Sequence, residues 1–298
     1  MKVIAPVTVT PAMLTSSSIA ETEYSTYSSG TTYAAAARVI YQRRVYESLQ
    51  ASNLNKTPGA TASAAWWLDV GPTNRWAMFD AIVGTKSTAT SSIAVTITPG
   101  TIINAVAFVS AVGSAIRVRM LDGVTVVYDQ TKNLDSTPID DWDDYFFAAQ
   151  VLTGELVFTG LPRYLSATVE ATITGIGTVS VGVMAIGVSH ELGGVLRGAS
   201  AGITDYSRKE TDATFGTTSL VQRDFAGKAD VTILVPTNDT RRLKYLLASL
   251  RAIPCVWVGD DDTDTYAPLV IFGWYGDFRI VYDFARYANF SLELKGLT

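Results

Sequence analysis

The stretch SATVEATITGIGTVSVGVMAIGVSH, residues 166–190, contains the two patterns that decide the fold. In residues 167–173 apolar and polar side chains alternate, which predicts a strand with one face in a core and the other in solvent. Residues 179–188 are apolar almost throughout, and Gly182 and Gly187 are typical of a central strand that another backbone approaches closely. We therefore expect a mainly β protein built around this segment.

The same alternation extends outward from this segment. Residues 93–97 and 115–120 also alternate at period two, and both runs are bounded by turn-forming dipeptides such as Pro99-Gly100 and Asp122-Gly123. Many short strands with such turns are typical of a β-sandwich of jelly-roll type. We assign this sandwich to residues 74–200.

The last hundred residues have a different pattern. A helix is predicted over residues 239–252, with Thr237 or Asn238 as its N-cap, because leucines recur there at helical spacing and Pro254 follows. Strands are expected on both sides of it, at residues 229–235, 255–258, 268–273, 277–283 and 288–295. Residues 201–298 are therefore predicted to be an α+β domain with one helix on an antiparallel sheet.

Two further units precede the sandwich. Residues 1–32 are poor in charge and rich in Ser and Thr. Residues 2–10 alternate like a strand, and we interpret the rest as an extended arm whose order depends on a neighbouring molecule; a floppy terminus is the alternative. Residues 33–73 form a small aromatic β module, with strands at 38–41 and 44–49 joined by a tight turn at Gln42-Arg43. Because so short a unit buries little apolar surface by itself, we expect it to pack against a neighbouring unit.

Composition excludes several classes of protein. Only 17% of the 298 residues are charged, against a usual ~25%, so much of the surface is covered by small uncharged residues or buried against other subunits. Acidic residues outnumber basic ones by 28 to 23, which argues against a nucleic-acid-binding protein. No apolar run of ~18 residues predicts a membrane helix, and no convincing secretory signal begins the sequence.

The sequence contains few of the residues that catalytic and metal-binding sites use. The sequence has one histidine, His190, and one cysteine, Cys255, whereas a Cys/His zinc site needs about three or four such ligands. His190 lacks a recognisable nucleophile partner, and Cys255 stands in an apolar run typical of a buried thiol. Phosphate-binding glycine motifs are also missing. We expect no catalytic residues, no cofactor and no metal, in a soluble protein of a reducing compartment.

Two acidic runs are candidate metal sites. Residues 260–264 and 140–144 each contain four aspartates, and clustered carboxylates suit Ca²⁺. The first run fails the EF-hand spacing, and a solvated hairpin loop is the simpler interpretation. The second precedes Tyr145-Phe146-Phe147 and is interpreted as an exposed turn that enters a strand. The two runs are also the only dense carboxylate candidates for glycoside hydrolysis, which we disfavour because both fit surface loops.

Aromatic residues gather near the small module. Exposed rings stack on the C–H faces of sugars, and aromatic residues of this region are therefore candidates for glycan contact. The alternative is that these rings form the miniature core of a unit with little else to bury. The candidates are Tyr41, Tyr46, Trp66, Trp67 and Trp76.

The module resembles the chitin-binding modules of carbohydrate-binding families 5 and 12. The shared pattern is carried by Tyr33, Val39, Tyr41, Tyr46, Pro58 and Trp67. Two departures concern the family's Gly-Asp after the first Tyr, replaced by Ala36-Ala37, and its exposed aromatics after the last Tyr, replaced by residues 48–51. The resemblance implies the scaffold of a sugar-binding module.

A longer resemblance covers most of residues 66–298. The segments WWLDVGPTNRWAMFD (66–80), GITDYSRKETD (202–212) and LLASLRAIPCVWVG (246–259), followed by 272–278 and 292–297, are similar to stretches of tail-tip and baseplate proteins of tailed bacteriophages. The start at 74–80 also resembles galactose-binding-like sandwiches. The resemblance implies a non-enzymatic virion subunit, distal-tail-like, whose C-terminal domain forms a ring.

The expected partners follow from this resemblance. They are copies of the chain itself, other phage tail proteins and a host-surface saccharide, with no nucleic-acid recognition and no membrane insertion. The resemblance places the protein in the virion tail, assembled in the host bacterial cytoplasm. The alternative is a carbohydrate-binding protein whose main task is glycan recognition.

Overall fold

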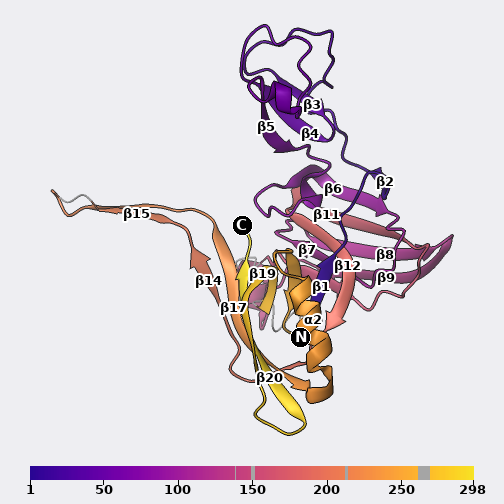
Figure 1. The fold of residues 1–298 in the computed structure, drawn as a ribbon, viewed down its shortest axis with the longest axis vertical. Coiled ribbons are helices and arrows are strands. Elements are labelled where there is room, and N and C mark those ends of the chain that lie inside the picture. Colours follow the sequence, from indigo (N-terminus) through magenta and orange to yellow (C-terminus); the bar gives the residue numbers. More distant parts are fainter. Residues whose placement is uncertain (138, 149–151, 212–213, 261–268) are drawn as a thin grey trace.

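The computed structural model describes residues 1–137, 139–148, 152–211, 214–260 and 269–298. The fold is mainly β, with antiparallel sheets and one helix on a sheet near the C-terminus (Figure 1). The described residues form a ten-stranded sheet, a five-stranded sheet, a three-stranded sheet and a two-stranded ribbon. The predicted mainly β class is confirmed.

The five-stranded sheet forms one layer of the sandwich. Its inward residues alternate along the strands, as Ile93, Val95 and Ile97 do, and all three are fully buried. They pack against Phe108 and Phe158 of the facing sheet, whose rings meet edge to face at 6.0 Å. The strand order is β2 (Leu14–Ser17), β6 (Ser87–Ile97), β11 (Thr168–Val181), β8 (Ala115–Asp122) and β9 (Thr125–Asn133).

The ten-stranded sheet supplies the other layer and continues beyond it. Its order along the main path is β10 (Leu156–Thr159), β7 (Ala105–Val109), β12 (Val183–Glu191), β1 (Lys2–Pro6), β18 (Cys255–Val258), β19 (Val270–Val281), β20 (Tyr287–Gly296), β17 (Phe225–Pro236) and β13 (Gly194–Val195). The tenth strand, β14 (Ser200–Asp205), pairs with β17. This sheet therefore joins strands of the predicted sandwich to strands of the predicted α+β domain.

Strand β1 makes that junction. It pairs with β12 on one side and with β18 on the other, so that Val3 lies opposite both His190 and Trp257. The side chain of Val3 enters the core beneath α2, whereas Ile4 enters a second core on the opposite face of the sheet. The strand pattern at residues 2–10 is confirmed by β1, whereas the interpretation of the following residues as an arm ordered by a neighbouring molecule is wrong for β2, which pairs with β6 of its own chain.

A corner at Gly182 moves the chain from one sheet to the other. β11 ends at Val181 in the five-stranded sheet, and β12 begins at Val183 in the ten-stranded sheet. The single central strand predicted over residues 179–188 is therefore two strands. A Cβ at Gly182 would lie 2.8 Å from the Val83 carbonyl oxygen, and one at Gly187 would collide with the Ala5 carbonyl oxygen. The close backbone approach predicted at both glycines is confirmed.

Helix α2 (Thr240–Ser249) covers one face of the ten-stranded sheet. It buries Leu243 and Leu247 against the strands, and the Tyr275 hydroxyl donates to the Leu247 carbonyl oxygen at 2.7 Å. The predicted caps Thr237 and Asn238 are wrong: both residues belong to the 3-10 turn η3 (Thr237–Asp239). The N-cap is Asp239, and its side chain makes no capping hydrogen bond.

The two remaining β units lie outside these layers. The small module is a sheet of β3 (Arg38–Tyr41), β4 (Arg44–Ser48) and β5 (Trp67–Pro72). The 3-10 turn η1 (Thr61–Ser63) lies between β4 and β5, and the 3-10 turn η2 (Ala77–Phe79) follows β5. A ribbon of β15 (Arg208–Thr211) and β16 (Thr218–Val221) extends away from the body (Figure 1). We call residues 200–225 the hairpin arm.

The segment that was predicted to lead into a strand at residues 145–147 forms a helix instead. Helix α1 (Trp142–Phe147) occupies the connection between β9 and β10, where residues 145–147 were expected to begin a strand. The side chain of Asp141 accepts a hydrogen bond from the Asp144 backbone N–H at 2.9 Å, which is the geometry of an N-cap. This local cap favours helix over strand for the residues that follow.

The junction at β1 gives a direct test. Gly187→Ala places a methyl group against the Ala5 carbonyl and should separate β1 from β12, lowering the free energy of unfolding by about 1–3 kcal/mol or more. Gly194→Ala is the matched control, since a Cβ there meets no atom within 4 Å. Urea unfolding measures both variants. Equal midpoints for the two would contradict the role assigned to this contact.

Candidate functional site

The small module is built around a hairpin and a cluster of rings. Gln42 and Arg43 both adopt positive φ, 47° and 68°, which matches the twist of a two-residue β-hairpin turn. The tight turn predicted there is confirmed by the β3–β4 pairing. Tyr33, Val39, Tyr46 and Trp67 form the buried centre of the module.

Two of the predicted glycan-contacting residues lie in that centre. Tyr46 is 8% exposed and Trp67 is 5% exposed. The Trp67 indole N–H donates to the Lys56 carbonyl oxygen at 2.6 Å, and its ring meets that of Tyr33 at 5.4 Å. Rings enclosed in this way hold the module together and offer little face to a sugar.

Tyr41 and Trp66 are only partly buried against the same cluster. The ring of Tyr41 meets Tyr27 edge to face at 5.6 Å, and the Lys56 ammonium stands 5.4 Å from the centre of the Trp66 ring. The structure therefore brings four of the five predicted residues into one module. Of these four residues, Tyr41 and Trp66 are the two whose side chains keep part of their surface accessible.

Trp76 belongs to a different environment. Its ring packs against the sandwich core and meets Phe79 at 5.8 Å, while the Arg43 guanidinium lies 4.9 Å from the ring centre. Since Arg43 is part of the β3–β4 turn, this cation–π contact ties the small module to the sandwich. Trp76 thus has a structural contact at the junction between the two units.

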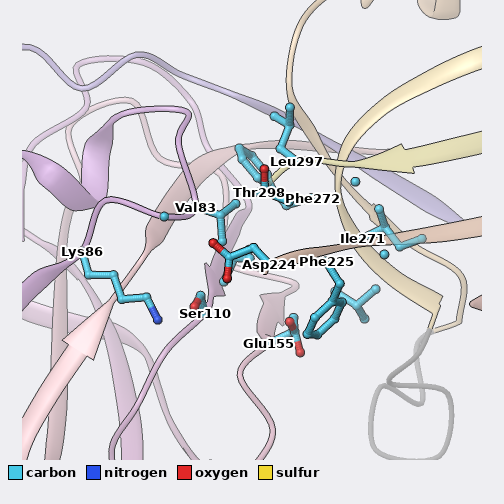
Figure 2. Close-up of a pocket in the computed structure, with 15 residues that line it drawn as sticks. Val83, Lys86, Ser110, Glu155, Asp224, Phe225, Ile271, Phe272, Leu297 and Thr298 are labelled. Carbon is cyan, nitrogen blue, oxygen red and sulfur yellow. The ribbon is translucent and has the colours of Figure 1, made fainter. Parts of the chain in front are cut away.

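A cavity of about 370 Å³ opens at the ends of β7, β10, β17 and β19 (Figure 2). Its polar groups come from segments far apart in sequence, among them Lys86, Ser110, Glu155 and Asp224. Burial raises the pKa of Glu155. The described lining residues include neither His190 nor Cys255.

His190 and Cys255 both have structural positions. Burial lowers the pKa of His190, and the nearby Arg242 and Arg163 lower it further, so its imidazole is neutral at pH 7. Burial raises the pKa of the Cys255 thiol to about 12, which keeps it protonated and unreactive. Both side chains belong to strands on either side of β1.

The two acidic runs differ in what the structure describes. Residues 140–144 lie at the start of α1, and this segment is exposed, as expected. Residues 261–264 of the second run lie outside the described residues. Among the described residues, no group of three or more His, Cys, Asp or Glu side chains is arranged to hold a metal ion. No helix within the described ranges has both the length and the apolar character needed to cross a membrane.

Two exposed surfaces were not found by sequence reasoning. Every residue of β14, β15 and β16 in the hairpin arm is exposed. Helix α1 buries none of its residues, although it carries Trp142, Tyr145, Phe146 and Phe147. A run of four aromatics beside four aspartates was the available signal for the second surface, because such rings are seldom left uncovered without a partner.

Comparison with protein families and with characterised proteins finds no match to this chain.

The position of Trp67 leads to a prediction about the module. Trp67→Ala should open it and raise amide exchange in β4 more than tenfold, because the ring fills its centre and holds the Lys56 carbonyl. Trp66→Ala, at the partly exposed neighbouring position, should change exchange by less than about threefold. Hydrogen exchange followed by mass spectrometry measures both. A larger effect for Trp66 would reverse the roles assigned to the two rings.

Proposed function

We propose that this chain is a non-enzymatic structural subunit of a bacteriophage tail tip or baseplate, which assembles with copies of itself into a ring near the distal end of the tail. Its partners on this proposal are further copies and other tail proteins. Its place is the virion tail, after assembly in the host bacterial cytoplasm. The observation that carries the proposal is the hairpin arm.

The β15–β16 ribbon of the arm has little to stabilise it within one subunit. β15 and β16 pair with each other from Arg208↔Val221 to Thr211↔Thr218, and β14 pairs with β17. A two-stranded ribbon is at best marginally stable in water. An arm of this form supports a protein that works in an assembly, where a neighbouring molecule covers the ribbon.

The arm also carries apolar side chains in solvent. Ile203 is 57% exposed, Leu220 73% and Phe225 60%. Residues 202–205 and 208–211, from the segment that resembles tail-tip proteins, lie in β14 and β15 of this arm. The low charged fraction of 17% agrees with extensive contact between subunits.

Substitution on the arm tests the proposal. Ile203→Asp combined with Leu220→Asp should raise the concentration needed for half-assembly at least tenfold, since it places charges where a neighbour is expected to pack. Thr204→Asp with Ser219→Asp, on equally exposed neighbouring positions, is the matched control. Sedimentation velocity measures assembly, and circular dichroism checks the fold. Wild-type assembly by the Ile203/Leu220 variant would contradict the arm's role.

Glycan recognition by the small module is the second candidate function. The observation that favours it is the partial exposure of Tyr41 and Trp66 on a module that resembles chitin-binding ones. We expect the full chain to bind chitin or another polysaccharide on a glycan array, and Trp66→Ala to reduce that binding at least tenfold. Absence of binding to every polysaccharide would exclude this candidate and leave the assembly proposal intact.

A further inference from the structure

The second exposed surface is the aromatic cluster of α1. Trp142 is 76% exposed, Tyr145 62%, Phe146 67% and Phe147 79%. The rings contact one another: Trp142 stacks on Phe146 at 6.4 Å, and Tyr145 meets Phe146 edge to face at 5.1 Å. Four large rings gathered on one exposed turn have the composition of an interface hot spot.

This cluster is strongly acidic. Residues 139–148 contain four aspartates and no basic residue. Asp141 caps the helix through its side chain, and the Asp144 carboxylate accepts from the Asp140 backbone N–H at 3.1 Å. The side chains of Asp140 and Asp143 have no part in these capping bonds. The surface that covers the rings is therefore expected to be basic as well as aromatic.

The start of α2 provides a surface of that kind. Thr240–Ser249 contains Arg241, Arg242 and Lys244 and no acidic residue, although the preceding N-cap carboxylate, Asp239, lies 3.9 Å from the Arg242 guanidinium. Tyr245 is 64% exposed, and the Arg241 guanidinium lies 6.0 Å from the centre of its ring.

The end of the β19–β20 hairpin extends this surface. The Tyr282 hydroxyl lies 3.5 Å from the Thr240 hydroxyl, and the Thr237 backbone N–H donates to the Arg286 carbonyl oxygen at 3.0 Å. Tyr282 and Phe284 are 61% and 59% exposed. Exposed rings and guanidinium groups thus lie together beside the start of α2.

The two surfaces belong to different parts of the chain. Helix α1 connects β9 and β10, which are edge strands of the two sheets. Glu155, at the start of β10, shares a cavity with Phe225 at the start of β17, whereas α2 follows the other end of β17. Because the two surfaces are different patches, a contact between them on two copies is heterologous.

We propose that the acidic aromatic cluster of α1 docks on the basic aromatic surface of α2 and the β19–β20 hairpin in a second copy of this chain. The contact is head to tail, which is the arrangement that generates rings when the rotation closes. This inference rests on the proposed function, because it names one interface of the assembly. Opposite charge sets the pairing, and burial of the rings supplies the affinity.

Charge reversal in the full-length chain tests this pairing. Variant one carries Asp140→Lys and Asp143→Lys, which leave the capping Asp141 and Asp144 in place; variant two carries Arg241→Glu and Arg242→Glu. Each alone should assemble at least tenfold more weakly than wild type. Mixed in equal amounts, the two should associate again, because Lys on one copy then faces Glu on the other. Sedimentation velocity and mass photometry give the result.

The other outcomes overturn the inference. If either variant assembles as wild type, or if the mixture stays dissociated, α1 does not dock on α2, and the proposed assembly then depends on other contacts such as the hairpin arm. If the wild-type chain never self-associates, the proposed function fails together with this interface. Binding of a polysaccharide that Trp142→Ala abolishes, with assembly unchanged, would identify α1 as a sugar site instead.

Discussion

The insertion of β1 between β12 and β18 is the constraint on which the rest of the structure depends. Its backbone pairs on both sides, and its side chains Val3 and Ile4 enter two different cores. Without β1, the strands of the sandwich and those around α2 would end in two unpaired edges. A strand at the beginning of the chain therefore unites elements that are far apart in sequence.

This arrangement also fixes what the surface can do. Because β1 and the packing at Gly187 make one continuous sheet, α1 and the hairpin arm are exposed features of a single body. Cys255 and His190 lie on the strands that flank β1, and neither is among the described residues that line the cavity beside Glu155. The exposed helix α1 and the exposed strands of the hairpin arm are surfaces open to contact with other molecules.

Much of the sandwich could be predicted from sequence, because half-buried strands alternate visibly. The runs at 93–97 and 115–120 fall inside observed strands, and the run at 167–173 does so from Thr168 onward. The corner at Gly182 could not be placed, because the chain is apolar on both sides of it and passes from one buried layer to the next. The pairing of β1 was equally hidden, since a five-residue strand carries no signal for partners more than 180 residues away.

The candidate surfaces were harder to predict for a related reason. A list of aromatic residues does not distinguish Trp67, which fills the module, from Trp66 beside it, which is only partly buried. The extended arm predicted at the N-terminus has its counterpart in residues 200–225, where polar strands gave no period-two pattern to recognise. Exposure depends on packing between distant segments, and local sequence does not record it.

Electron microscopy of the purified full-length chain at high concentration tests the central claim most directly. The account predicts closed rings in which density for the hairpin arm of each subunit lies on the next subunit. Single separate particles at every concentration, with the arm extending into solvent, would contradict it.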